Sequence, residues 1–496
     1  MYHPSFEEFC QEAARGNIIP IYREILGDMF TPVSAFVRLG DGKYSYLLES
    51  VVGGEKWARY SFIGINPSTV IKGKDREVEI VRDGVSTKTY FNRDPLEVLK
   101  KEIDRYIPIE VDGLPRFFGG AVGYIGYDVV RFFEELPYRE KDGLDLPDFF
   151  FGITDTIVIF DSLTQKIKVV SNAYIEGKGL REAYNEAIDK IDGIIRKLRG
   201  ENYGSRFTVL SSRLSTLDSR LSSNFTRDAF KEAVLRAKEY IKAGDIFQVV
   251  LSQRFERDIS ASPFDVYRAL RVINPSPYMY FLRMGEAVLV GSSPEILVRL
   301  EGSTVTVRPI AGTRRRGRTE KEDMALENEL KADPKENAEH IMLVDLGRND
   351  VGRVSVMGSV KVTELMGVER YSHVMHLVSN VEGILDNGND TYDVMRACFP
   401  AGTVSGAPKI RAMEIIEELE PTRRGPYAGA VGYISFSGNM DTCITIRTIL
   451  INDGKAYIQA GAGIVADSDP EREYIETVNK AKGMMKAIEM AEEGLS

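Results

Sequence analysis

The sequence predicts an α+β protein that is built on antiparallel sheets. Its strand-like segments follow one another as hairpins and do not alternate with helices, which is typical of antiparallel pairing. The clearest hairpin turn, Asn452-Asp453-Gly454, joins two apolar segments at 442–451 and 455–460. Because 496 residues are too many for a single hydrophobic core, we also expect two large domains.

The first 200 residues contain signals for helices and for two hairpins. Ser5 and Glu8 form a capping box, which predicts a helix that ends near Gly16. The other elements expected here are a hairpin over 35–49 that turns at Gly40, Asp41 and Gly42, a helix over 94–106, a hairpin formed by 156–160 and 166–170, and a helix over 179–198. The polar, serine-rich stretch 201–225 predicts a linker, which places the two domains at 1–200 and 226–496.

The second part begins with a helix over 227–243 that stops at Gly244. Its expected strands are 247–255, 278–283, 287–291, 295–300, 305–309, 429–436, 442–451 and 455–460. The hexapeptide GAVGYI occurs twice, at 120–125 and 429–434, which suggests that both domains contain a similar strand.

Composition excludes several classes of protein. The net charge of −10 argues against nucleic acid or an anionic membrane as a partner. Cys10, Cys398 and Cys443 are odd in number and widely spaced, which argues against a disulfide framework and predicts a reducing cytoplasm. No apolar run approaches the roughly 20 residues of a membrane span, and the N-terminus does not resemble a signal peptide.

Two segments place paired carboxylates on predicted helices. Each helix opens with Asp-Pro, at 333–334 and 469–470, and each carries an E-x-x-E pattern on one face. The side chains concerned are Glu336 and Glu339 on the first helix, and Glu473 and Glu476 with Lys480 on the second. Facing carboxylates of this kind favour a hard cation such as Mg²⁺. Two solvent-exposed glutamate faces would give the same pattern, so the residues alone leave both interpretations open.

Four further features carry chemistry. The segments FPAGTVSGAPK at 399–409 and QAGAGIV at 459–465 offer the small residues and backbone N–H groups that bind anions, although the first is also consistent with a tight loop before a helix. Neither is a phosphate loop or a dinucleotide fingerprint. His376 has apolar neighbours and is either a core residue or a general acid or base. Arg447 lies in a predicted strand of alternating pattern, so its side chain either faces solvent or pairs with an anion inside the protein.

The motifs PIAGT at 309–313, ENAEHIMLVDLGRND at 336–350, FPAGTVSGAPK and QAGAG resemble those of the chorismate-binding enzymes. LES at 48–50 and NPSPYM at 274–279 are similar to the large components of anthranilate synthases in particular. The resemblance implies two large antiparallel sheets packed face to face with helices outside. It also implies the Mg²⁺-dependent conversion of chorismate and ammonia to anthranilate and pyruvate, in tryptophan biosynthesis.

The resemblance further implies a role for individual residues. Glu339 and Glu476 match the direct Mg²⁺ ligands, with Glu336 and Glu473 acting largely through water. Residues that match the substrate site are Gly312, Thr313, Thr403, Tyr427, Arg447, Gly461, Ala462, Gly463 and Lys480, and the catalytic set is His376, Thr403 and Glu336. The residues that match a tryptophan feedback site are Glu49, Ser50, Pro277, Tyr278, Met279, Val431 and Cys443.

Two positions separate this chain from relatives of the family. Gln248 stands where isochorismate and salicylate synthases carry a lysine base, and Ala311 stands where aminodeoxychorismate synthases carry a lysine. No cysteine has the glycine-rich setting of an amidotransferase nucleophile, so ammonia is expected from a separate glutamine amidotransferase subunit.

Two other functions compete with this one. A sensor of L-tryptophan that kept the fold would be expected to have lost Glu339, Glu476 or His376, and all three are present. A Mg²⁺-dependent phosphate enzyme would need a phosphate loop, and the sequence has none.

Overall fold

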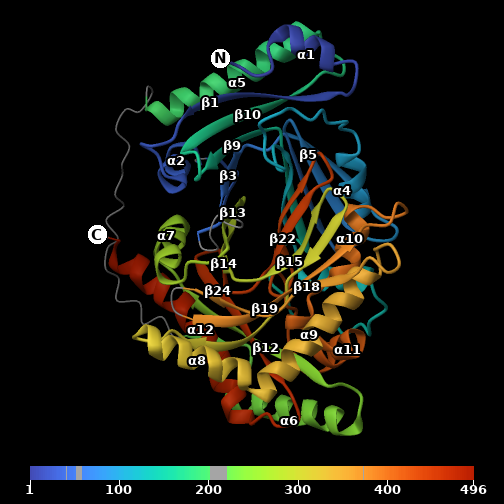
Figure 1. Cartoon of the computed structure of the whole chain (residues 1–496), viewed down its shortest axis with the longest axis vertical. Coiled ribbons are helices and arrows are strands. Elements are labelled where there is room, and N and C mark those ends of the chain that lie inside the picture. The colour runs from blue at the N-terminus through green and yellow to red at the C-terminus, as the bar shows by residue number, and fades with distance from the viewer. Residues whose placement is uncertain (41, 52–58, 201–220, 372–373, 496) are drawn as a thin grey trace.

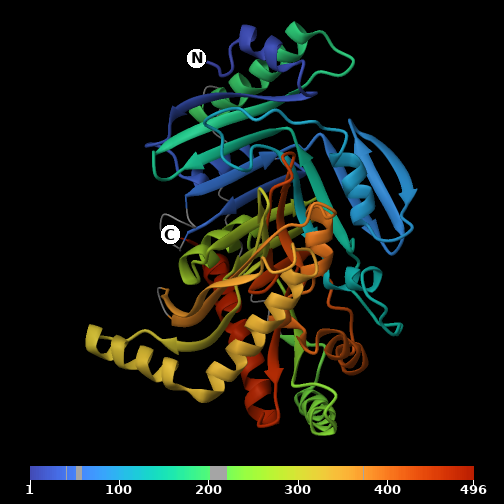
Figure 2. The same cartoon turned by 45° about the vertical axis from the view of Figure 1, so that its right-hand side comes forward.

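The computed structural model describes residues 1–40, 42–51, 59–200, 221–371 and 374–495. In this part of the chain two twelve-stranded antiparallel sheets pack against each other, with helices outside them (Figures 1 and 2). The predicted α+β class and the pair of large antiparallel sheets are confirmed. Most of the predicted linker, 201–220, lies outside the described residues, so the division into two domains stays a prediction.

The first sheet contains strands from both ends of the chain. Its order is β1 (Ile18–Leu26), β10 (Lys166–Tyr174), β9 (Thr156–Asp161), β3 (Tyr60–Ile65), β2 (Tyr44–Glu49), β13 (Tyr278–Met284), β14 (Ala287–Ser293), β23 (Thr448–Asn452), β24 (Lys455–Ile464), β12 (Gln248–Asp258) and β11 (Ser222–Ser223), with β20 (Gly406–Ala407) paired to β12. The helices α1 (Phe6–Glu12), α2 (Pro32–Leu39), α5 (Leu180–Arg199), α7 (Pro263–Ile273) and α12 (Pro470–Glu493) contribute buried side chains to the apolar cluster on this sheet.

The second sheet has the order β17 (Ile310–Arg315), β19 (Val374–Ile384), β16 (Thr304–Val307), β15 (Ile296–Glu301), β22 (Met440–Ile444), β21 (Ala430–Ser435), β7 (Gly120–Ile125), β8 (Phe149–Thr154), β4 (Thr69–Lys74), β5 (Glu77–Arg82) and β6 (Val85–Tyr90), with β18 (Lys361–Arg370) paired to β19. The remaining helices are α4 (Leu96–Ile103), α6 (Arg227–Ala243), α8 (Glu320–Ala332), α9 (Pro334–Gly352), α10 (Thr391–Cys398) and α11 (Lys409–Leu419). Aromatic side chains from both sheets, such as Phe62 and Tyr433, meet in the core between them.

Local sequence explains most helix boundaries. Ser5 and Glu8 make both hydrogen bonds of the predicted capping box at α1, and Gly244 ends α6 in the left-handed conformation. The Asp333 side chain caps α9 by accepting hydrogen bonds from two backbone N–H groups. The Asp469 side chain caps α12 by accepting one such hydrogen bond. Within the described residues no helix is long and apolar enough to cross a membrane.

The hairpin predicted over 35–49 is wrong, because the first part of that segment belongs to helix α2. Thr31 caps this helix and Pro32 occupies its first turn, where no N–H donor is needed. Ala35, Phe36 and Leu39 are buried on one face of the helix, and the strand β2 begins only at Tyr44. The same apolar residues fit a strand and a helix, and the cap decides between the two.

The two halves of the chain, 1–200 and 221–495, repeat one arrangement. The two halves meet in the first sheet where β2 lies beside β13. Counted outward from this junction, the first half supplies β2, β3, β9, β10 and β1, and the second half supplies β13, β14, β23, β24 and β12. The corresponding series in the second sheet are β7, β8, β4, β5, β6 and β21, β22, β15, β16, β19. Figure 2 shows the first half, blue to green, above most of the second. Among the described elements, the helices α8, α9 and α11 and the strands β11, β17, β18 and β20 have no counterpart in the first half.

The two GAVGYI segments are neighbours across this junction. They form β7 and the start of β21, which pair in an antiparallel register that sets Gly123 opposite Gly432. A Cβ atom on Gly123 would lie 1.8 Å from the Phe150 carbonyl oxygen, and one on Gly432 would lie 2.1 Å from that of Asp441. The glycines of the repeat therefore allow adjacent strands to approach closely at the centre of the second sheet.

Candidate active site

A cavity of about 620 Å³ lies in the second half of the chain, among the helices α9 and α12 and the strands β12, β17, β19 and β24. It brings together residues that are up to 236 positions apart, from Gln248 to Met484. The predicted site residues that line it are Gly312, Thr313, Glu336, Glu339, His376, Thr403, Tyr427, Arg447, Gly461, Gly463, Glu473, Glu476 and Lys480. Ala462 is fully buried in the apolar core instead, because successive residues of a strand face opposite sides.

Carboxylates from α9 and α12 occupy one side of the cavity. Burial raises the pKa of Glu339, and the neighbouring carboxylates of Glu336 and Glu476 raise it further. The pKa of Glu473 is also raised, by burial and by the Glu476 carboxylate. The two E-x-x-E helices thus place their charges within electrostatic reach of one another.

Several cations and donors hold these carboxylates in the structure. Gln248 Nε2 donates to Glu339 Oε1 over 3.0 Å, and Lys480 Nζ lies 2.7 Å from Glu476 Oε1. Arg314 Nη1 lies 2.9 Å from Glu336 Oε1. Among the described side chains, no three His, Cys, Asp or Glu stand close enough together to form a ready metal-binding group. The donor set still fits Mg²⁺ in its chemistry, since this ion prefers carboxylate oxygens and keeps several of its waters.

The other side of the cavity is cationic and rich in backbone groups. Arg447 has a positive φ of 52°, and its Nη1 donates to the Lys480 carbonyl oxygen over 3.0 Å. Burial lowers the pKa of the Arg447 guanidinium, so an anion beside it would be favourable. A Cβ on Gly461 would lie 2.7 Å from Tyr427 Oη, and one on Gly463 would lie 2.4 Å from Gln248 Nε2. A larger residue at either position would therefore displace the Tyr427 or Gln248 side chain from its place in the cavity wall.

His376 lines the cavity as a neutral ring. Its Nδ1 lies 3.0 Å from the carbonyl oxygen of Gly312 and 3.0 Å from Thr313 Oγ1. A carbonyl oxygen can only accept, so Nδ1 carries the proton and Nε2 does not. Burial lowers the pKa of His376, which keeps the ring neutral at pH 7. This histidine can accept a proton at Nε2.

The structure adds Glu295, which our sequence analysis did not identify as a site residue. Its side chain is buried in the lining of the same cavity, and Thr403 Oγ1 donates to Glu295 Oε1 over 2.7 Å. Burial raises the pKa of Glu295 to about 8, so its carboxyl group is protonated at neutral pH. The sequence feature that could have indicated a buried acid here is the position of Glu295, between Pro294 and the apolar strand β15.

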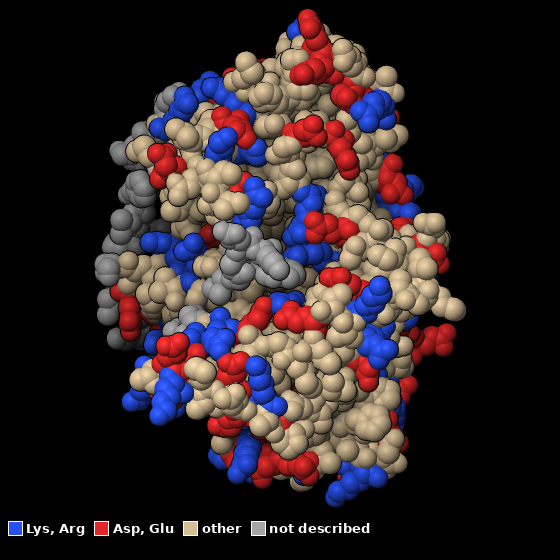
Figure 3. All heavy atoms as spheres, viewed as in Figure 1, with Lys and Arg blue, Asp and Glu red and all other residues tan. Residues whose placement is uncertain are grey.

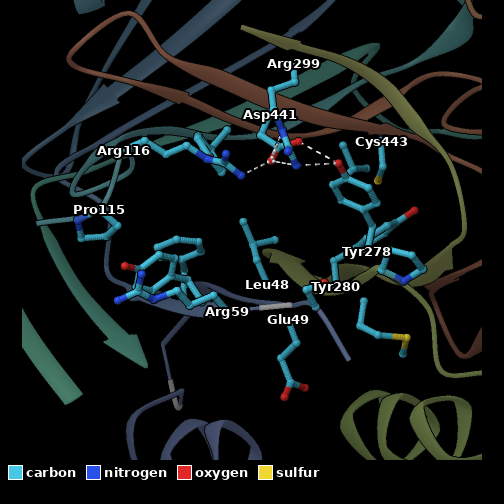
Figure 4. Close-up of a pocket in the computed structure, with 18 of the residues that line it drawn as sticks. Leu48, Glu49, Arg59, Pro115, Arg116, Tyr278, Tyr280, Arg299, Asp441 and Cys443 are labelled. Carbon is cyan, nitrogen blue, oxygen red and sulfur yellow. Dashed lines mark hydrogen bonds and ion pairs between the residues drawn. The ribbon is translucent and has the colours of Figure 1, made fainter. Parts of the chain in front are cut away.

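A second cavity, of about 410 Å³, lies where the two halves of the chain meet. All seven residues of the predicted tryptophan site line it: Glu49, Ser50, Pro277, Tyr278, Met279, Val431 and Cys443. Figure 4 shows Arg116 and Arg299 converging on Asp441, which also accepts a hydrogen bond from Tyr278 Oη over 2.9 Å. This cluster forms a charged wall of the cavity.

Glu49 and Ser50 differ in how they present their side chains. In Figure 4 the Glu49 side chain points away from Arg116, Arg299 and Asp441. Its carboxylate accepts hydrogen bonds from Tyr267 Oη and, over 3.1 Å, from Arg271 Nε on helix α7. Ser50 Oγ is buried and has no hydrogen-bond partner among the described residues. Ser50 is therefore the freer of the two polar groups.

The cysteines do not form a nucleophilic site in the structure. Cys398 and Cys443 are buried, and burial raises the pKa of both thiols, which disfavours the reactive thiolate. Cys10 lies on α1 and lines neither cavity. On the face shown in Figure 3, acidic and basic side chains are intermixed, without a broad region of one sign.

Comparisons with known proteins agree with the geometry. The family model described as chorismate binding enzyme matches residues 45–486. An anthranilate synthase component 1 from Acetivibrio thermocellus is 51% identical over 494 residues, covering 99% of this chain and all of the relative. One from Aquifex aeolicus is 51% identical over 490 residues, covering 99% of this chain and 98% of the relative.

A solved structure is also similar over most of its length. The crystal structure of anthranilate synthase component I from Streptococcus pneumoniae superposes with a TM-score of 0.76 at 40% identity, covering 93% of this chain and 98% of the other. With the predicted motifs gathered around one cavity, the chain belongs to the chorismate-binding enzyme family and, within it, to the anthranilate synthase component 1 proteins.

Proposed function

We propose that this chain converts chorismate and ammonia to anthranilate and pyruvate, with Mg²⁺ as its cofactor. The observation that carries the proposal is the polarity of the 620 Å³ cavity, with paired glutamates on one side and Arg447 on the other. Chorismate has two carboxylates, one on the ring and one on the enolpyruvyl group. A metal held by glutamates would suit the first carboxylate, and a buried guanidinium would suit the second.

The residues that would hold the ion are Glu339 and Glu476 directly, with Glu336 and Glu473 through water. When bound, Mg²⁺ would hold the ring carboxylate and draw electron density toward it. Arg447, Tyr427 and the backbone at Gly461 and Gly463 would hold the enolpyruvyl carboxylate. Lys480 donates to the Gly461 carbonyl oxygen over 2.9 Å, which fixes this strand against α12.

Two titratable groups with opposite protonation states fit the two proton transfers that the reaction needs. Ammonia attacks C2 of the ring and the C4 hydroxyl leaves, which requires a proton on the departing oxygen. Glu295 is protonated at neutral pH and is held by Thr403, so it suits the acid role. Loss of the C2 proton then expels the enolpyruvyl group as pyruvate and makes the ring aromatic. His376, with Nε2 unprotonated, suits the base role.

The choice of nucleophile follows from two neutral side chains. Gln248 donates to Glu339 and has no basic nitrogen with which to activate water. Ala311 lines the cavity and cannot form a covalent bond to the ring. Ammonia needs neither residue, since its neutral form is already a nucleophile. A separate glutamine amidotransferase subunit would supply it, because both buried cysteines are poor nucleophiles.

The cavity at the junction is proposed to bind L-tryptophan as a feedback inhibitor. The rings and side chains of Pro277, Tyr278 and Met279 offer an apolar enclosure, and Ser50 Oγ offers an unsatisfied polar group. The strands that line it are β2 and β3 of the first half and β13, β15, β21 and β22 of the second. A ligand here would contact both halves.

Product analysis tests the reaction. Purified chain with chorismate, Mg²⁺ and ammonium salt at alkaline pH should yield anthranilate and pyruvate, identified by mass. Glutamine should not replace the ammonium salt unless an amidotransferase subunit is added. Isochorismate as the main product, or glutamine-dependent turnover by the single chain, would overturn the assignment.

Removing a proposed Mg²⁺ ligand should suppress turnover without unfolding the protein. Glu339→Gln and Glu476→Gln each keep the side-chain volume but remove a hard anionic oxygen, and we expect kcat/KM to fall by about 10²-fold or more. Glu471→Gln is a matched control, because Glu471 lies on the same helix α12 but pairs with Arg227 outside the cavity. Near wild-type activity in both cavity variants would refute the metal assignment.

Glu295→Gln should separate the acid role from packing. Glutamine has the shape of the protonated acid but cannot give up a proton, so turnover should fall by about 10²-fold while folding is preserved. Wild-type turnover, measured at constant free ammonia, should decline as the pH rises through about 8, where Glu295 ionises. Glu286→Gln, at an exposed turn, should behave as wild type.

The stability of this variant gives an independent readout with a defined sign. In the unfolded chain Glu295 ionises near its ordinary pKa, whereas in the native state it stays protonated up to about pH 8. Its burial therefore costs increasing stability as the pH rises from the ordinary value to 8. Glu295→Gln should gain stability relative to wild type across that window. An unchanged difference between pH 5 and 8 would contradict the raised pKa.

Ser50→Phe should weaken inhibition by L-tryptophan. The phenyl ring would occupy the junction cavity, which does not include the proposed reaction site, so uninhibited turnover should stay close to wild type. Ser86→Phe, on the exposed strand β6, is the control. An inhibitory concentration that is the same in Ser50→Phe and wild type would place the effector elsewhere.

A further inference from the structure

The repeat of the two halves places another cavity at the position equivalent to the candidate active site. This third cavity, of about 290 Å³, lies in the first half beneath helix α5, which crosses the top of Figure 1. Its lining includes Ile18 of β1, whose pairing partner on β10 is Tyr174. In the second half, Val250 of β12 pairs with Gly463 of β24, and both line the active-site cavity.

Helices α5 and α12 carry matching side chains into these two cavities. Seven residues after its N-cap, each helix has a glutamate, Glu186 after Gly179 and Glu476 after Asp469. Four residues further on, each has a lysine, Lys190 or Lys480. All four side chains line their respective cavities. The Glu–Lys pair of the candidate active site thus has a counterpart in the first half.

Most of the other acidic groups of the candidate active site are missing from the third cavity. Ala183 stands four residues after the cap of α5, where α12 has Glu473. Ser68 follows Pro67 as Glu295 follows Pro294, so a hydroxyl replaces the protonated acid. Helix α9, the source of Glu336 and Glu339, has no counterpart among the described elements of this half. The third cavity, at about 290 Å³ against about 620 Å³, is smaller than the candidate active site and lacks most of its acidic groups.

Four cations line this cavity, and the carboxylates at it are Asp83, Asp155 and Glu186, with Glu102 paired to the two arginines. The cations differ in how many of their N–H donors these carboxylates engage. Lys190 Nζ lies 2.7 Å from Asp155 Oδ2, and Lys178 Nζ lies 2.5 Å from Glu186 Oε2. Arg82 and Arg105, which also line the cavity, both bind the single carboxylate of Glu102. Two guanidiniums have ten N–H donors between them, so one shared carboxylate leaves donors for another anion. A ligand carboxylate would satisfy them.

The remaining lining specifies the rest of the ligand. The rings of Tyr106 and Tyr174 meet edge to face, with centroids 5.4 Å apart, and form an aromatic wall. Asn172 is 3% exposed, and its Nδ2 donates to the carbonyl oxygens of Phe118 and Asp155. These two bonds fix the amide, and its buried Oδ1 has no partner among the described residues. A ligand hydroxyl or N–H group that reached this oxygen would supply the missing hydrogen bond.

We propose that the third cavity binds a small aromatic carboxylate that bears a hydroxyl or amino donor, without a metal ion. The carboxylate lies toward Arg82 and Arg105, the ring lies against Tyr106 and Tyr174, and the donor meets Asn172 Oδ1. The inference does not depend on the reaction proposed for the other cavity. It rests on the repeat of the fold, the unmatched guanidinium donors and the unsatisfied amide oxygen.

The test uses 2-, 3- and 4-hydroxybenzoate as probes, with benzoate as the analogue that lacks the donor. Binding to the full-length protein is measured by ligand-observed NMR titration in the absence of Mg²⁺. At least one hydroxybenzoate should bind in the millimolar range or tighter, and benzoate should bind about tenfold more weakly. The donor contributes through Asn172, so this difference should vanish in Asn172→Ala.

Matched variants locate the site. Arg105→Gln should weaken binding of the same probe by about tenfold, because a charged hydrogen bond is lost. Arg93→Gln, a surface arginine outside the lining, and Arg447→Gln in the active-site cavity should leave its affinity unchanged. Should Asn172→Ala fail to fold, Arg105→Gln decides alone, since the Arg105 side chain is 47% exposed. Absence of binding to wild type, or binding lost in Arg447→Gln but retained in Arg105→Gln, overturns the proposal.

Discussion

Two antiparallel strand pairs, β2 with β13 and β7 with β21, make both sheets continuous across the two halves of the chain. Each pair is centred on residues that correspond in the repeat, Leu47 opposite Phe281 and Gly123 opposite Gly432. Without these pairings each half would expose two strand edges with unsatisfied backbone groups. The junction cavity exists because the strands that form this seam come from both halves. Its charged wall of Arg116, Arg299 and Asp441 also joins the two halves.

The chemistry of the 620 Å³ cavity depends on what burial does to charge. Removal from water disfavours every ionised form, so Glu295 holds its proton and His376 loses one. The two groups are therefore pushed into opposite roles by the same physical cause, and each is oriented by a hydrogen bond to a neighbour. The carboxylates of α9 and α12 are also costly to bury as anions. That cost is what a divalent cation and a bound substrate would relieve.

A single arrangement of strands and helices occurs twice, and the two copies differ in what was added to them. The insertion that contains α8 and α9 supplies Glu336 and Glu339 only to the second half. Substitution at single positions, Ala183 for Glu473 and Ser68 for Glu295, removes further acidic groups from the first. A cavity lined by the last helix of the half is present in both halves. Fold and chemistry are thus separable within one chain.

Sequence by itself determined the features that depend on near neighbours. Asp333 and Asp469 cap helices because their own side chains reach the backbone two or three residues ahead. The E-x-x-E spacings of α9 and α12, the hairpin at Asn452-Asp453-Gly454 and the motifs of the family are local patterns of the same kind. The buried face of α9 is not: Ile341 is exposed, and the helix buries His340, Leu343, Val344, Gly347 and Val351 instead. The hairpin expected over 35–49 is wrong because its apolar spacing also fits a helix, and the cap at Thr31 favours the helix.

Tertiary structure decided which of these features face one another. Gln248, at the start of β12 in the first sheet, meets Glu339, 91 residues away, on a helix that packs against β17 and β19 of the second sheet. The state of Glu295 and the direction of the Glu49 side chain depend on burial and on partners from other elements. The repeat of the two halves is almost invisible in sequence apart from GAVGYI, since strand pairing conserves spacing and burial but not side-chain identity. Such contacts form between segments far apart in the chain, and no local pattern specifies them.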